Sequence, residues 1–162
     1  MVTAFTIPEQ KIWELLEEVC DPEIPVLSVL DLGIVRDVKS NAGEVEVIIT
    51  PTYTGCPAMD MIAMNIRMAL LEHGYKIVKI TSVLSPAWTT DWMSEEGKLK
   101  LKEYGIAPPL MRSDHPGLTP VIECPQCHST NTRLISEFGS TACKSLYQCN
   151  DCKEPFDYFK CH

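Results

Sequence analysis

Two pairs of cysteines in the last third of the sequence have the spacing of a metal site. Cys124 and Cys127 form one pair, Cys149 and Cys152 form the other, and residues 128–148 lie between them. Each Cys-x-x-Cys pair can form a tight turn whose two sulfurs face one ion, and four thiolates complete a tetrahedral shell. The pattern therefore predicts a four-cysteine site for Zn²⁺ in a zinc-ribbon module, with iron in the same geometry as the alternative.

The segment that carries these cysteines, 121–162, is short and has few large apolar side chains. A module of this size needs a metal or another crosslink in addition to its core. Cys143 and Cys161 lie in the same segment. Each is interpreted as a structural thiol, with a spare ligand or part of a second site as the alternative.

Another candidate for chemistry is Cys56, which ends a loop of Pro, Thr and Gly residues. A β-branched run precedes the loop, and a helical pattern follows Pro57, a residue suited to the first turn of a helix. Cys56 is therefore expected at a strand-to-helix turn, where backbone N–H groups favour the thiolate that attacks electrophiles and binds metals. The alternative is a small buried thiol that caps the helix.

The rest of the first hundred residues is interpreted as a scaffold for this turn. Apolar residues at helical spacing predict helices at 6–20, 58–73 and 94–104. Alternating patterns predict strands at 34–38, 44–50 and 77–84. The helix at 58–73 is expected to be mostly buried, with its methionines in the core. The strand–helix–strand order indicates a crossover unit, so the expected fold class is α/β (α+β), a small mixed sheet with packed helices, followed by the zinc ribbon.

The boundary between the two parts is expected in a polar stretch that is rich in proline and glycine. The sequence predicts an α/β domain at 1–107, a linker at 108–120 and the ribbon domain at 121–162. Before the linker, Trp88 and Trp92 lie in a polar loop and are expected to be exposed as a docking surface for a protein partner. The alternative is that both cover the sheet edge or the core.

Composition excludes several classes of protein. The chain has 162 residues and a net charge of −8, which does not favour binding to nucleic acid or to an anionic membrane. The first ten residues lack the pattern of a secretory signal, and no apolar run approaches the roughly 18 residues that span a bilayer. A cytoplasmic location is expected, and there eight cysteines favour metal or thiol chemistry over disulfides.

Three separated motifs together resemble a known family. They are Asp21-Pro22-Glu23, the stretch at 28–35 (Ser-Val-Leu-Asp-Leu-Gly-Ile-Val) and Thr54-Gly55-Cys56-Pro57. Over about residues 9–106 the sequence resembles the small domain of iron–sulfur maturation factors. The loop at 86–93 and the C-terminal cysteine module narrow the resemblance to PaaD-type accessory subunits of the phenylacetyl-CoA epoxidase (ring 1,2-epoxidase) system.

This resemblance implies an accessory role in the maturation of metal centres. The expected partners are the di-iron oxygenase and reductase subunits of the epoxidase and Fe–S assembly proteins, and a homodimer is left open. Transient Fe²⁺ or an Fe–S cluster is the implied cargo, with Zn²⁺ as the structural ion. Cys56 matches the family's reactive cysteine. The positions that match its other motif residues are Asp21, Glu23, Asp31 and Thr54.

Other functions remain as alternatives. A thiol-dependent enzyme would need a base near Cys56, but His73 stands at the far end of the following helix, over 20 Å away at about 1.5 Å per residue. A ribbon that binds nucleic acid would need a basic face, which 120–162 does not have. A stable, non-catalytic subunit of the epoxidase complex is compatible with the sequence.

Overall fold

The computed structural model describes residues 7–110 and 120–160. The chain divides into two compact units, one that ends at Trp88 and one that begins at Thr89. No helix among the described residues combines the length and the apolar character that crossing a membrane requires.

The first unit is a two-layer α+β fold. Its elements in chain order are α1 (Ile7–Glu17), β1 (Val35–Asn41), β2 (Glu44–Ile49), α2 (Ala58–Glu72) and β3 (Ile77–Ser82). The strand order is β1-β2-β3, with β1 antiparallel and β3 parallel to β2. The small mixed sheet and the β2–α2–β3 crossover expected from the sequence are confirmed.

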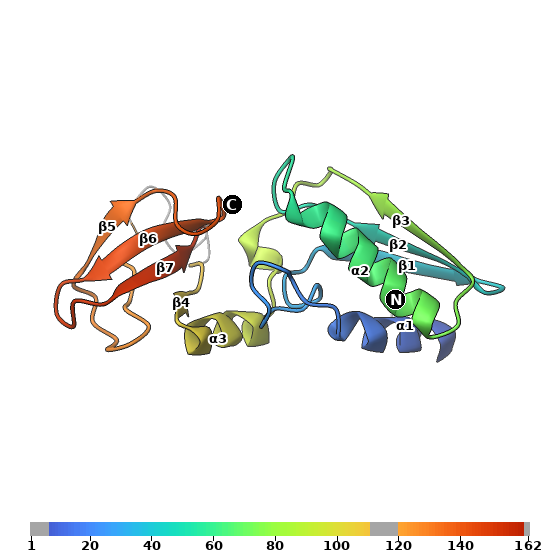
Figure 1. The fold of residues 1–162 in the computed structure, drawn as a ribbon, viewed down its shortest axis with the longest axis horizontal. Coiled ribbons are helices and arrows are strands. Elements are labelled where there is room, and N and C mark those ends of the chain that lie inside the picture. The colour runs from blue at the N-terminus through green and yellow to red at the C-terminus, as the bar shows by residue number, and fades with distance from the viewer. Residues whose placement is uncertain (1–6, 111–119, 161–162) are drawn as a thin grey trace. The chain divides into compact units, whose positions relative to one another are not determined.

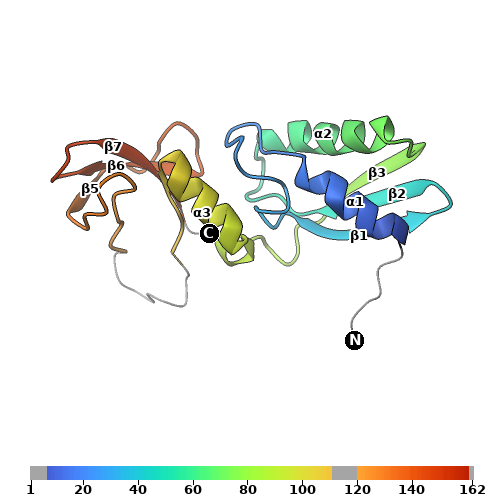
Figure 2. The ribbon, with the colours of Figure 1, turned by 90° about the horizontal axis from the view of Figure 1, so that it is seen from below.

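One face of this sheet is covered by both helices. Helix α1 packs against β1 and α2, and α2 packs against β3; Figures 1 and 2 together place both helices on the same side of the sheet. Because side chains alternate along a strand, Val45, Val47 and Ile49 point to the helices and are buried. Glu46 points to the other face, where it accepts from the Thr81 hydroxyl at 2.6 Å.

The second unit contains the ribbon and the elements that lead into it. Its elements are a short 3-10 helix (Thr90–Trp92), α3 (Glu95–Tyr104), β4 (Ile106–Ala107), β5 (Thr132–Ser136), β6 (Lys144–Cys149) and β7 (Pro155–Phe159). The strand order is β4-β7-β6-β5. Helix α3 begins where the Ser94 hydroxyl accepts from the Gly97 N–H at 2.9 Å, and it ends at Gly105 with a φ of 94°.

Helix α3 and β4 pack within the second unit, although the sequence suggested that they belong to the first domain. Strand β4 pairs with β7 through Ile106 and Ala107. The Lys102 ammonium of α3 lies 3.0 Å from Glu123, beside the first cysteine pair. These are long-range contacts that a local pattern cannot reveal. The predicted boundaries at 107 and 120 stay a prediction, because most of the linker lies outside the described residues.

Two expectations about burial are wrong. Helix α2 is buried only along Ala58, Ile62, Ile66 and Leu70. Its opposite side is exposed, at 51% for Met61, 61% for Met64, 51% for Met68 and 41% for Leu71. Trp88 is not exposed as a docking residue but is 4% exposed, in line with the alternative that it covers the core, and its indole N–H donates to the Leu32 carbonyl at 2.8 Å.

Trp92 is half-buried. Of the two remaining cysteines of the ribbon segment, Cys143 is buried with its sulfur 3.0 Å from the Thr141 hydroxyl. This placement fits the structural interpretation of Cys143. Cys161 lies outside the described residues.

Candidate functional site

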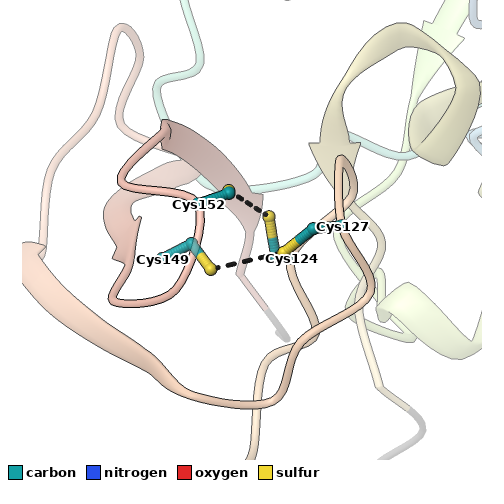
Figure 3. A group of neighbouring side chains, drawn as sticks. All are labelled: Cys124, Cys127, Cys149 and Cys152. Carbon is teal, nitrogen blue, oxygen red and sulfur yellow. Dashed lines mark hydrogen bonds between the residues drawn. The ribbon is translucent and has the colours of Figure 1, made fainter.

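The four paired cysteines converge in the second unit. Their sulfurs all lie within 4.8 Å of one another, and Figure 3 shows the side chains approaching from two separate turns. Cys124 and Cys152 have sulfurs 3.7 Å apart, and Cys127 and Cys149 have sulfurs 3.5 Å apart. A tetrahedron with Zn–S bonds of about 2.3 Å has edges of about 3.8 Å. The donor set therefore fits a tetrahedral metal ion.

The backbone of the two turns follows one pattern. The N–H of Cys124 donates to the carbonyl of Ser129 at 2.9 Å, and the N–H of Cys149 donates to the carbonyl of Glu154 at 3.0 Å. The residue after each pair, His128 or Lys153, has a positive φ of 62° or 69°. Residue type did not signal this left-handed conformation, because glycine and asparagine are its usual occupants.

The close packing of the four cysteines and their backbone hydrogen bonds shift the pKa values of the thiols. Backbone N–H groups of Cys152 and Asp151 lower the pKa of Cys149 to about 7 against the effect of burial. The backbone N–H of Glu154 favours the Cys152 thiolate, but burial and the neighbouring sulfurs outweigh it and raise the pKa of Cys152 to about 12. Four thiolates repel one another at these distances, and a bound dication offsets part of that repulsion by attracting each sulfur.

An exposed hydrogen-bond network that the sequence did not predict joins the two turns. Asp151 accepts from the Ser129 hydroxyl and, at 3.0 Å, from the Asn131 amide. The Asn150 amide donates to the Asn131 side chain at 2.9 Å, and the Asn150 N–H donates to the Asn131 carbonyl at 2.8 Å. The bonds from Ser129 and Asn131 lower the pKa of Asp151. We call Ser129, Asn131, Asn150 and Asp151 the Asp151 network.

Cys56 lies in the first unit, on the loop between β2 and α2, and is half-buried. Gly55 before it has a φ of 80°, a conformation that a residue with a Cβ rarely adopts. The Cys56 N–H donates to the Tyr53 carbonyl at 3.3 Å, and its carbonyl accepts from Met59 at 3.2 Å. Pro57 occupies the N-cap position, and no side chain caps α2. The strand-to-helix turn is therefore present, without a capping bond from the thiol.

Two of the other motif residues, Asp21 and Asp31, form hydrogen bonds within their own turns. Asp21 accepts from the N–H groups of Glu23 and Ile24 at 2.7 and 2.8 Å, which closes the turn at 21–24. Buried Asp31 accepts from the N–H of Ser28 at 3.1 Å, and the Ser28 hydroxyl accepts from the N–H of Asp31 at 3.0 Å.

Glu23 is half-buried and Thr54 is exposed. In the described part of the chain, no group of three or more metal-ligating side chains includes Cys56, Asp21, Glu23 or Asp31. The structure thus assembles the ribbon cysteines into one cluster but does not assemble these motif residues into another.

Comparison with known families also separates the part of the chain that contains Cys56 from the part that contains the four ribbon cysteines. A model of the iron–sulfur cluster assembly protein family matches residues 9–81, and a model of the PaaD zinc beta ribbon domain matches residues 111–160. The chain is therefore a two-part protein, an Fe–S assembly domain followed by a zinc ribbon.

A protein of Escherichia coli (strain K12), named as a subunit of 1,2-phenylacetyl-CoA epoxidase, is 54% identical over 152 residues, covering 93% of this chain and 92% of the relative. The chain belongs to this PaaD family.

Shorter relatives match only part of the chain. An Fe-S protein maturation auxiliary factor of Porphyromonas gingivalis is 43% identical over 103 residues, covering 62% of this chain and 97% of the relative. The crystal structure of DUF59, a domain of unknown function, from Bacillus anthracis has a TM-score of 0.54 at 28% identity and covers 57% of this chain and 90% of that one.

Proposed function

We propose that this chain is an accessory factor that delivers iron or an Fe–S cluster to the metal-containing subunits of phenylacetyl-CoA epoxidase, with Cys56 as the transfer residue. The observation that carries the proposal is how the relatives divide. The relative that covers 93% of the chain is named as an epoxidase subunit, whereas the relatives that cover 62% and 57% of it are named Fe-S protein maturation auxiliary factors. The Fe–S assembly family model matches residues 9–81, the part of the chain that contains Cys56.

The geometry of Cys56 supports transfer rather than storage. A donor must hold iron loosely and leave coordination positions open for the acceptor, and one thiolate on a loop satisfies this better than a cage of four. Cys56 is half-buried, with exposed Thr54, Gly55 and Pro57 beside it, so an acceptor can reach the sulfur.

The ribbon site has a different role in this proposal. Cys124, Cys127, Cys149 and Cys152 hold one structural Zn²⁺, because a closed set of four thiolates leaves no position open for exchange. When bound, the ion supplies crosslinking energy and no chemistry. Metal analysis of the purified chain should give close to one zinc per molecule. An ordered ribbon with no metal, or one with iron in place of zinc, would contradict this assignment.

The test of the transfer role is Cys56→Ser in cells that express the epoxidase. The variant should fold normally and keep its ribbon metal, because no capping bond is lost and the ribbon lies in the other unit. The epoxidase from these cells should have underfilled metal sites and low specific activity. Cys20→Ser is the matched control, since Cys20 is an exposed cysteine of the same unit. Full metal content and activity with Cys56→Ser would refute the role of Cys56.

A second candidate is a stable, non-catalytic subunit, which the naming of the Escherichia coli relative as part of the epoxidase favours. In that case the chain co-elutes with the mature epoxidase at fixed stoichiometry. A maturation factor instead leaves the complex after loading. Size-exclusion chromatography of the complex before and after metal loading separates the two functions.

A further inference from the structure

Helix α2 is apolar on two opposite sides. Its buried side carries Ala58, Ile62, Ile66 and Leu70. We call the exposed set Met61, Met64, Met68 and Leu71 the Met stripe. At 3.6 residues per turn the centres of the two sets lie roughly 160° apart around the helix. The outer side of a surface helix is normally polar, so an apolar outer side needs a reason.

The exposed apolar side chains of the Met stripe follow one side of α2 and are not scattered singly over the surface. Single exposed apolar side chains are ordinary, but contiguous apolar patches mark interaction sites. The spacing of three, four and three residues along the stripe is that of the a and d positions of a coiled coil. A stripe of this kind packs against another helix. Methionine suits such a contact because its flexible side chain adapts to the opposing surface.

Charged side chains border the Met stripe and are available to a partner. On one flank Asp60 and Arg67, with Ala63 and Met64, line a hollow of about 230 Å³. On the other flank lies exposed Glu72. Within the ranges 7–110 and 120–160, neither Asp60 nor Arg67 forms a side-chain hydrogen bond or an ion pair. A partner helix with a basic residue opposite Asp60 and an acidic residue opposite Arg67 would complement the charges of this flank. The two charge pairs would form in only one orientation of the partner helix along α2.

The size and position of the Met stripe indicate what kind of partner binds. Stable interfaces use about 20–30 residues on each side, far more than four side chains and their flanking charges. The stripe therefore fits a brief contact better than a permanent dimer. It also begins five residues after Cys56, because α2 starts directly beyond the Cys56 loop. An acceptor that takes cargo from Cys56 must approach this end of α2.

We propose that the Met stripe is the docking surface for an amphipathic helix of the acceptor protein, bound transiently while Cys56 hands over its cargo. This inference rests on the proposed transfer function and adds where the acceptor binds. The partner helix presents an apolar seam to the stripe and opposite charges to Asp60 and Arg67. A second copy of this chain is the competing occupant.

The experiment measures binding of the chain to the other epoxidase subunits, purified without it and immobilised for interferometry. Met64→Lys should weaken binding at least tenfold, and Met64→Leu should retain it. Arg67→Glu should also weaken binding, and the difference in affinity between this variant and the wild type should shrink as salt is added. Leu99→Lys on α3 is the matched control, because Leu99 is similarly exposed at 56% and lies in the other unit. Thermal melting verifies that each variant is folded.

Three results would overturn the docking surface. They are a wild-type chain that does not bind the subunits, Met64→Lys that binds as wild type, or a wild-type dimer that Met64→Lys converts to a monomer. The last result would assign the stripe to a second copy. Cys56→Ser separates this inference from the transfer function, because it should bind as wild type and fail to load metal. Met64→Lys could lose binding while the epoxidase from cells with Cys56→Ser is fully active. That combination would support the docking surface and reject the transfer role of Cys56.

Discussion

At the scale of single residues, Asp31 is a motif residue with a structural role. Its carboxylate and the Ser28 hydroxyl each accept from the other residue's N–H, at 3.1 and 3.0 Å, and both residues are buried. This reciprocal pair holds the turn at 28–31 just before β1. Asp21 closes the preceding turn in a similar way. Part of the motif that resembles maturation factors therefore builds the loops of the first unit.

Asp31→Ala should lower the free energy of unfolding of the first unit by about 1–3 kcal/mol, because it leaves the buried Ser28 N–H without this acceptor. Urea denaturation, followed by a probe in the first unit, measures the change. Ser28→Ala should have a smaller or equal effect, since it removes the other half of the same pair. Unchanged stability with loss of epoxidase maturation would instead give Asp31 a direct part in transfer.

At the scale of elements, the ribbon site depends on how its two turns are held together. Each turn has its own backbone bonds, but the Asp151 network is a connection from one turn to the other. Hydrogen bonds beyond the ligands commonly change metal affinity by about 10–100-fold. The network therefore helps to keep the two cysteine pairs at ligand distance.

Asp151→Ala should release zinc roughly tenfold faster than the wild type, within the range expected for groups beyond the ligands. Transfer of zinc to an excess of a chromogenic chelator measures the rate. Glu154→Ala is the control, because Glu154 is an exposed carboxylate next to the same turn but outside the network. Equal release rates for the two variants would mean that the network does not position the ligands.

The sequence predicted those elements that depend on local patterns. The strands of the first unit, the crossover and helix α3 follow from alternation and helical spacing. Burial was harder to predict, because apolar spacing does not tell which side of α2 faces the sheet. The sequence could not decide between an exposed and a buried Trp88, because its hydrogen-bond partner, Leu32, lies 56 residues away in the sequence. The Asp151 network is likewise formed by side chains that no spacing rule connects.

At the scale of the whole molecule, the second unit extends beyond the cysteine module. It includes α3 and β4, whose contacts with the ribbon include the β4–β7 pair and the ion pair of Lys102 with Glu123. Glu123 also lies 2.9 Å from His128, directly after Cys127, and Lys102 and His128 together lower the pKa of Glu123. The first turn of the metal site thus contacts α3. A short amphipathic helix such as α3 is marginal without tertiary contacts.

Removal of the metal should therefore unfold α3 together with the ribbon while the first unit stays folded. Structural zinc supplies about 10–16 kcal/mol of apparent binding energy in small modules, enough to account for their folding. After chelation, amide hydrogen exchange in 95–107 should accelerate to the rate of an unfolded chain, and exchange in 58–72 should not change. Cys124→Ser should have the same effect without a chelator. Continued protection of 95–104 in the metal-free chain would mean that α3 folds with the first unit, as the sequence alone suggested.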